Sequence, residues 1–243
     1  MRRVLVLSIV LVSALTVAAD DFEKVLLTVA PSVVNCGYDS HYDTRLVVFN
    51  SRDREVRGLP AQTGAVIEGA DTMVPLPSFI YLRKEDANAL SMSLLVESSD
   101  RKHPEARSFN ELPVVREREF TAGKIQIPGV RMDEGFRKTL RIYGLDGHTA
   151  TPVRVRVYSL AASKLLFEHD YSLMPAGPMF NAEGQQAAPA FNMECDLSNY
   201  WLETDGTPVR VEVEPLFPAT KIWAFVSVTN NTTQHFYNVL PQR

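Results

Sequence analysis

The densest group of side chains that could do chemistry lies between Cys36 and Asp43, where one imidazole stands between two carboxylates. Asp39, His41 and Asp43 alternate with other residues shortly after a predicted strand. Imidazole nitrogen and carboxylate oxygen atoms are ligands that suit zinc or manganese. One expectation is therefore a metal site formed by these three residues, which a hydrolase could use. The alternative is an ordinary polar loop with Asx turns.

Aromatic residues form a second candidate site. Tyr200 and Trp201 precede an Asp-Gly dipeptide, and Phe180 lies in the long, nearly uncharged range Met174–Asn192. Flat rings that face solvent can stack on sugars or peptides, whereas buried rings form a core. We expect Tyr200, Trp201 and Phe180 to bind a ligand, and the alternative is that their rings pack in the core or between domains. For Trp223, within the apolar segment IWAFVSV, we expect burial in the core.

A third group, Glu168-His169-Asp170, lies in a predicted strand. Successive side chains of a strand point to opposite faces of the sheet. The imidazole should therefore point away from both carboxylates, beside Phe167 and Tyr171. This spacing argues against a site in which all three groups converge.

The chain has two cysteines, Cys36 and Cys195. In an oxidising compartment they could form a disulfide across a long loop. The alternative is two separately buried thiols. Two cysteines are too few for a disulfide-rich scaffold or a cysteine-based zinc site.

The sequence lacks the local signatures of the common catalytic machineries. It contains no G-x-S-x-G, H-E-x-x-H, P-loop, G-x-G-x-x-G or EF-hand motif. Catalytic groups can still be assembled from distant positions, so an enzyme is not excluded. We expect a non-enzymatic protein that needs no cofactor.

Alternation of period two dominates the chain and predicts half-buried strands. Val153, Val155 and Val157 alternate with polar residues, and the pattern recurs from Val209 to Val213. We expect further strands at 25–34, 45–50, 78–82, 90–97, 114–120, 124–127, 138–143, 164–173, 222–229 and 235–240, and one short helical turn at 84–89. Many short strands between turns are typical of antiparallel sandwiches.

A ten-residue repeat is the most specific pattern in the chain. Thr151–Leu160 and Thr207–Leu216 agree at seven positions. The first copy begins shortly after the dipeptide Asp146-Gly147, and the second begins directly after Asp205-Gly206. We expect two related strand–turn–strand units in one C-terminal sandwich. The alternative is convergence on the same strand-forming residues.

Residues 1–19 have the order of a secretory signal peptide, with two arginines, an apolar run and small residues before Asp20. The alternative is an uncleaved N-terminal anchor. Cleavage would remove Arg2 and Arg3 and change the net charge from −4 to about −6. A net negative charge argues against nucleic acid or an anionic membrane surface as the partner.

The polar range 98–113 is poor in aliphatic residues and is interpreted as a linker or long loop. It would divide the chain into domains at 20–107 and 108–243. Both pieces are long enough for a sandwich with its own core. One large sandwich is the alternative.

The segments RIYGLDG, TPVRVRVYSL and WAFVSVTNNTTQHFYNVLPQ resemble uncharacterised secreted bacterial proteins with tandem immunoglobulin-like β-sandwich domains. The resemblance covers the C-terminal half and extends loosely to the first half. It implies the fold and export, and it carries no catalytic motif. Immunoglobulin-like folds serve adhesion, spacing and binding roles, so the resemblance leaves the function open.

Together these features predict an all-β protein with two antiparallel immunoglobulin-like β-sandwiches in tandem after an N-terminal signal peptide. We expect a secreted, periplasmic or extracellular protein that does not insert into the membrane after signal cleavage. It would be a non-enzymatic binding or structural module that presents loops or sheet edges to a protein or glycan. The alternative is a secreted hydrolase or carbohydrate-active protein that uses the loop around Asp39–Asp43 or Met174–Asn192.

Overall fold

The computed structural model describes residues 22–28, 40–56, 59–68, 78–100, 107–145, 151–173, 179–180, 186–189, 191–197 and 207–242. At 40–42, 67–68, 78 and 100, and in the strands between 179 and 196, only the backbone is described. The described residues form an all-β protein of antiparallel sheets. Their helical structure is confined to α2 (Lys84–Ala87) and the 3-10 turn η2 (Glu117–Glu119). Neither has the length or hydrophobicity to cross a bilayer.

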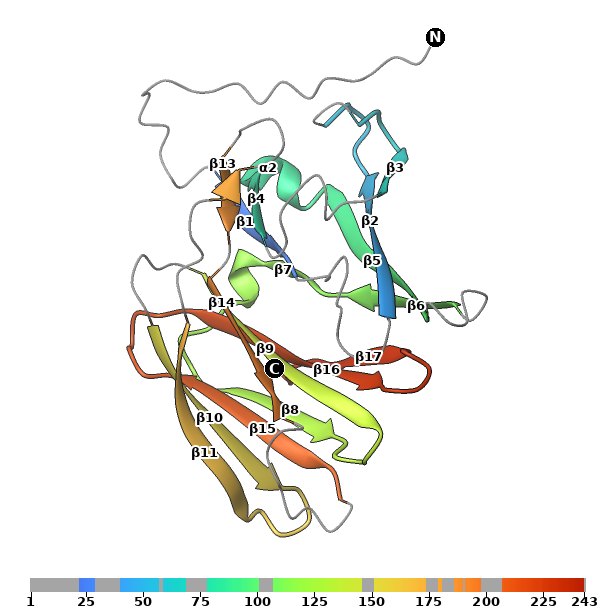
Figure 1. The fold of residues 1–243 in the computed structure, drawn as a ribbon. Helices are drawn as coiled ribbons and strands as arrows, with labels where there is room; N and C mark the ends of the chain where they lie inside the picture. The colour runs from blue at the N-terminus through green and yellow to red at the C-terminus, as the bar shows by residue number, and fades with distance from the viewer. Residues whose placement is uncertain are drawn as a thin grey trace.

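Two sheets form the N-terminal lobe (Figure 1). The β4 sheet has the order β12-β13-β4-β1-β7, and the β2 sheet has the order β3-β2-β5-β6. The strands are β1 (Phe22–Leu27), β2 (Ser40–Asn50), β3 (Gly64–Glu68), β4 (Ser78–Arg83), β5 (Leu90–Asp100), β6 (Arg107–Leu112), β7 (Val114–Arg116), β12 (Met179–Phe180) and β13 (Gln186–Pro189).

Two further sheets form the C-terminal lobe. The β10 sheet has the order β11-β10-β15-β8, and the β9 sheet has the order β14-β9-β16-β17. The strands are β8 (Ile125–Val130), β9 (Phe136–Gly144), β10 (Thr151–Ser159), β11 (Leu165–Leu173), β14 (Phe191–Asp196), β15 (Val209–Pro215), β16 (Ile222–Asn230) and β17 (Phe236–Val239).

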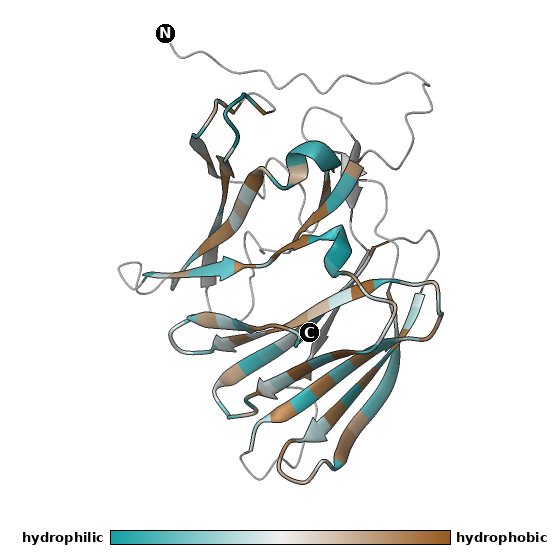
Figure 2. Ribbon diagram, turned by 180° about the vertical axis from the view of Figure 1, so that it is seen from behind, coloured by the Kyte–Doolittle hydropathy of each residue, from teal (hydrophilic) through white to brown (hydrophobic). Residues whose placement is uncertain are grey.

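The core of the C-terminal lobe lies between these two sheets, as the period-two alternation predicted. Val153, Val155 and Val157 of β10 are fully buried and pack with Leu140 and Ile142 of β9 in one cluster. The intervening residues of β10 are half-exposed. Figure 2 shows the resulting alternation of hydrophilic and hydrophobic residues along the strands of this lobe. β10 therefore has one face in the core and one face toward solvent.

The β9 sheet contributes to two cores, and its strand β16 is buried on both faces. Ile222 and Ala224 of β16 contribute to the core shared with the β10 sheet, whereas Trp223 and Phe225 join Tyr143 in the core of the N-terminal lobe. The ring centroids of Trp223 and Phe225 are 5.4 Å apart. Trp223 is 6% exposed, which confirms its predicted burial. β16 has apolar residues at both odd and even positions, which is the pattern required of a strand that is buried on both faces.

Polar contacts also join the lobes. The Ser98 hydroxyl of β5 donates to the backbone oxygen of Gln234, before β17, at 3.3 Å. The ammonium group of Lys24 in β1 donates to the backbone oxygen of Leu145, after β9, at 3.4 Å. Gln234 is 1% exposed, so this junction excludes solvent. The lobes pack through a shared core and direct hydrogen bonds.

The range expected to be a linker contains strands instead. β5 extends to Asp100, and β6 begins at Arg107 and pairs with it in antiparallel register. The expectation of a linker was wrong at these positions because β6 is an exposed edge strand, so its composition is polar. β7 pairs with β1, and β13 pairs with β4, so segments beyond residue 107 complete the N-terminal lobe. The division of the chain after residue 107 stays a prediction.

The two copies of the repeat are neighbouring strands in one sheet. β10 and β15 pair in antiparallel register, with Val155 opposite Val213. After the first copy the chain returns in the same sheet as β11, and after the second it crosses to the β9 sheet as β16. β11 is mostly exposed or half-exposed, whereas β16 is buried along nearly its whole length. Both units have the order strand, turn, strand, and the different apolar content of β11 and β16 explains why their sequences agree only weakly after the turn.

Candidate functional site

The outer face of the β2 sheet carries charged and apolar side chains from all four of its strands. On β2, Asp43, Arg45, Val47 and Phe49 share this face because side chains alternate along a strand. Leu46, at the opposite parity, is buried in the core. The odd-numbered residues of β2 from Asp43 to Phe49 therefore point away from the core.

The strand register brings distant residues onto the same face. Glu97 of β5 lies opposite Asp43, and Phe109 of β6 lies opposite Glu97. In the next row, Ser99 of β5 lies opposite Arg107 of β6. The pairing of three strands thus builds one surface from separate parts of the chain.

A pocket of about 200 Å³ opens on this face and is lined by Asp43, Arg45, Glu97, Ser99 and Arg107. The Glu97 side chain is only 10% exposed. Its Oε2 accepts a hydrogen bond from Nη2 of Arg45 at 3.2 Å, and its Oε1 accepts one from Nη1 of Arg107 at 2.8 Å. Nη2 of Arg45 also lies 3.6 Å from Oδ2 of Asp43.

The pocket has balanced charge, with two guanidinium groups and two carboxylates. A guanidinium has five N–H donors in a planar fork, and Glu97 accepts a hydrogen bond from each arginine. Planar forks of this kind match carboxylate groups and contribute strongly to protein interfaces. The chemistry of this pocket suits polar contacts with a partner.

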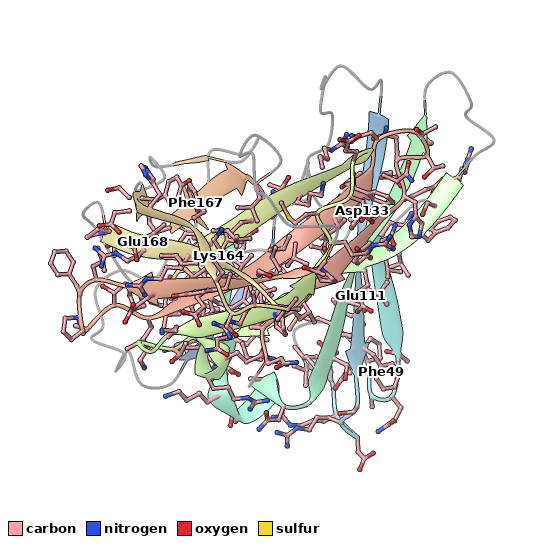
Figure 3. The ribbon with its side chains drawn as sticks, turned by 90° about the horizontal axis from the view of Figure 1, so that it is seen from below. Phe49, Glu111, Asp133, Lys164, Phe167 and Glu168 are labelled. Atoms are coloured by element: carbon pink, nitrogen blue, oxygen red, sulfur yellow. The ribbon has the colours of Figure 1, made fainter. Side chains whose placement is uncertain are left out.

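Apolar side chains lie on the same face as the pocket. Phe49 is 41% exposed, Val66 of β3 is 58% exposed, and Phe109 is 63% exposed. Val66 lies opposite Val47, which is half-buried. Figure 3 shows Phe49 and Glu111 on strands of this lobe. Exposed apolar residues beside polar groups are typical of interaction surfaces.

The outer face of the β10 sheet differs because its charges are paired with one another. Nε and Nη2 of Arg154 donate to the two carboxylate oxygens of Asp170 at 2.6 and 2.8 Å. Arg156 donates to Glu168 and Glu214. The hydrogen bond from Arg154 lowers the pKa of Asp170, and the one from Arg156 lowers the pKa of Glu214. This face is a charge ladder of reciprocal ion pairs.

The imidazole of β11 lies where its parity predicted. The His169 ring contacts the edge of Tyr171, with centroids 4.6 Å apart, and lies 6.2 Å from the ring of Phe167. Glu168 and Asp170 are on the opposite face with their arginine partners. The expectation that these three groups do not converge is confirmed.

The predicted metal site falls only partly within the described residues. Asp39 lies outside them, and His41 is described only as a backbone position of β2. The carboxylate of Asp43 lies in the pocket beside Arg45. Among the residues that the structure describes, no three histidine, cysteine, aspartate or glutamate side chains form a group able to hold a metal. The metal site stays a prediction.

The aromatic and cysteine predictions also stay open. Tyr200, Trp201 and Cys36 lie outside the described residues. The backbone of Phe180 pairs with Gln186 in β12 and β13. Cys195 lies on β14, where its backbone pairs with that of Leu140 in β9. The side chains of Phe180 and Cys195 are not described.

Sequence reasoning missed most of the pocket. Arg45 belongs to a predicted strand, and its place in the alternation indicates that its side chain faces solvent. The alternation does not indicate which residues of other strands lie beside it. Arg107 and Phe109 fell in the expected linker. The alternation of Arg107, Phe109 and Glu111 is a weak strand signal that could have identified β6.

Comparisons with models of protein families, with curated proteins and with solved structures found no match for this chain.

Proposed function

We propose that this protein is an exported, non-enzymatic binding module of two immunoglobulin-like β-sandwiches. It presents the outer face of the β2 sheet to a partner protein outside the cytoplasm. The antiparallel sheets packed face to face support the sandwich architecture. The signal-like order of residues 1–19 supports secretion or a periplasmic location.

One observation carries this proposal, namely the combination of apolar exposure and arginine on a single sheet face. Phe109 and Val66 are the two most exposed large hydrophobic side chains of the described residues, and Phe49 is also exposed. They share the face with the pocket that contains Arg45 and Arg107. Interface centres are enriched in aromatic residues and arginine relative to the remaining surface.

A protein is the partner that best suits this chemistry. The chain has a net charge of −4, and the arginines of the pocket already face carboxylates, so the surface lacks the positive potential that phosphate backbones require. A protein can offer apolar side chains to Phe49 and Val66. It can also offer a backbone carbonyl or a carboxylate to the guanidinium groups.

Site-specific photocrosslinking in the source cells tests the proposal. A photoreactive phenylalanine analogue would replace Val66, 58% exposed on the proposed face, or Phe217, 56% exposed between β15 and β16. We expect a saturable adduct with a protein other than this chain from position 66 and not from position 217. The adduct would be identified by mass spectrometry.

Affinity for the purified crosslinked partner then provides a quantitative check. Phe49→Ser together with Val66→Ser should weaken binding by about tenfold or more, because central interface side chains contribute over 1 kcal/mol each. The matched change Phe217→Ser should leave affinity within about twofold. Equal crosslinking at both positions, no adduct at position 66, or unchanged affinity of the double variant would refute the proposal.

A further inference from the structure

Among the described strands, β6 ends its sheet, and none of them pairs with its edge on the side away from β5. In the sheet order β3-β2-β5-β6, β5 is its ladder partner among the described strands. Figure 1 shows β6 at the margin of the N-terminal lobe, above β17. The backbone groups of an edge strand that do not face the sheet are available to another strand.

One polar contact already reaches this strand from the other lobe. Nδ2 of Asn238 in β17 donates to the backbone oxygen of Glu111 at 2.7 Å. A carbonyl oxygen has two lone pairs and can accept a second hydrogen bond. The contact therefore holds the end of β6 against β17, and the Glu111 oxygen keeps the capacity for a second hydrogen bond.

The outer side chains of β6 form a self-complementary series. Phe109 lies at the centre and is the most exposed large hydrophobic side chain in the described part of the chain, at 63%. Arg107 precedes it by two residues and Glu111 follows it by two, and both are exposed. Arg107 also pairs with Glu97, and Glu111 accepts a hydrogen bond from Ser93. Both partners lie on the same sheet face.

We propose that β6 pairs in antiparallel register with β6 of a second copy of this chain. A twofold axis at Phe109 places Phe109 opposite its counterpart and Arg107 opposite Glu111 in both directions. Such an interface is isologous and closes as a dimer. It joins the two β2 sheets into one continuous sheet with both outer faces on the same side.

Charge complementarity selects this register over its neighbours. A shift that moves the axis to Ser108 puts Arg107 opposite Phe109, and one that moves it to Asn110 puts Phe109 opposite Glu111. Both shifts lose the ion pairs and the aromatic pair, which are the contacts that stabilise neighbouring strands. Pro113, directly after β6, has no N–H and prevents extension of the ladder.

The dimer goes beyond the proposed binding function and does not depend on it. If a partner protein is present, the continuous sheet offers it two copies of the outer face, which raises avidity. Without a partner, the purified chain should still dimerise. The test therefore uses the exported chain alone, so its failure is distinct from failure of the proposed function.

Sedimentation equilibrium on the exported chain measures the dimer directly. We expect a dimer that dissociates on dilution. Arg107→Glu and Glu111→Arg should each weaken dimerisation by about tenfold or more, because the twofold axis places the repulsive pair in the interface twice. The double variant restores opposite charges across the axis, so its dissociation constant should return to within about threefold of the original.

The double swap is also the matched control for contacts within one chain. It keeps the carboxylate introduced at position 107 beside Glu97, so restored dimerisation can come only from the contact between copies. Phe109→Lys should abolish the dimer, and Phe217→Lys, at a similarly exposed position in the other lobe, should leave it intact. Thermal unfolding curves would verify that each variant is folded.

Three results would overturn the proposal. The first is a wild-type chain that stays monomeric up to about 100 μM. The second is a double charge swap that fails to restore dimerisation lost in the single swaps. The third is a dimer that survives Phe109→Lys.

Discussion

Arginine side chains form ion pairs on the outer sheet faces of both lobes, and the two groups of arginines differ in how they bind their carboxylate partners. In the pocket, Arg45 and Arg107 share one carboxylate, that of Glu97 in β5, from the two strands that flank β5. On the β10 sheet, Arg154 instead forms a two-pronged pair with Asp170. The first arrangement lies in a pocket that opens to solvent, whereas the second directs both prongs of the guanidinium to a carboxylate of the same sheet.

The charge ladder on the β10 sheet should make stability depend on acid pH. Hydrogen bonds from Arg154 and Arg156 lower the native pKa values of Asp170 and Glu214. Their contribution is therefore fully present above the unfolded pKa values of about 4. It is lost as the pH falls through the lower native values, because the unfolded chain then binds more protons. Urea unfolding measured at a series of pH values between 7 and 2 should show this loss.

A double-mutant comparison assigns the loss to one pair. Asp170→Asn should reduce the fall in unfolding free energy below about pH 4. Arg154→Gln should have the same effect, since the carboxylate then loses its hydrogen-bond donor. The double variant should add nothing further. An unchanged pH profile in both single variants would contradict this assignment.

At the scale of elements, Arg116 connects the end of β7 to three other segments. Its Nη1 lies 3.3 Å from the carboxylate of Glu23 in β1. Its Nη2 donates to the backbone oxygens of Ala87 at 2.6 Å and Leu90 at 2.7 Å, around the turn from α2 to β5. The Arg116 side chain is 15% exposed and that of Glu23 is 11% exposed. One guanidinium thus satisfies acceptors that water reaches poorly.

Arg116→Ala should lower the free energy of unfolding by about 3–5 kcal/mol, because it leaves a nearly buried carboxylate and two carbonyl oxygens without a donor. Arg116→Lys should recover only part of this loss, since an ammonium group lacks the planar fork. Urea denaturation of the two variants measures both values.

The neighbouring Arg118 provides the control for this prediction. It is exposed and donates to the side chain of Asn88 at 3.2 Å. Arg118→Ala should change stability by less than about 0.5 kcal/mol. If Arg116→Ala and Arg118→Ala lower the free energy of unfolding equally, the contacts of Arg116 do not contribute the stability predicted here.

At the scale of the whole molecule, the β9 sheet couples the two lobes. Phe225 is fully buried on the face toward the N-terminal lobe, where its ring stacks on Tyr143 with centroids 6.4 Å apart. The opposite face of the same strand packs against the β10 sheet. Loss of order in either lobe would therefore expose one face of the shared sheet.

We expect the two lobes to unfold in one cooperative transition. Phe225→Ala should lower the free energy of unfolding by about 3–5 kcal/mol, as is typical when a buried phenylalanine is truncated. Phe217→Ala, at an exposed site, should change it by less than about 0.5 kcal/mol. Far-ultraviolet circular dichroism and tryptophan fluorescence during urea unfolding should give coincident curves for each protein. Two separated transitions would refute the coupling.

Local patterns were sufficient to predict most strands. The alternating valines of β10 and the apolar run of β16 indicated buried residues correctly, because side-chain parity and hydrophobicity are properties of neighbouring residues. Five strands were missed, namely β3, β6, β12, β13 and β14. β3 and β6 are edge strands whose order depends on pairing with β2 and β5, and a local window contains no information about that partner.

The sequence by itself determined an all-β chain, the parity of its main strands and the burial of Trp223. Only the tertiary structure decided that β6 and β13 complete the N-terminal lobe, that the β9 sheet serves two cores, and that Asp43, Glu97 and Arg107 meet in one pocket. The physical reason is that strand register joins distant segments. Register follows from the burial of whole sheet faces, a condition that no single segment can satisfy alone.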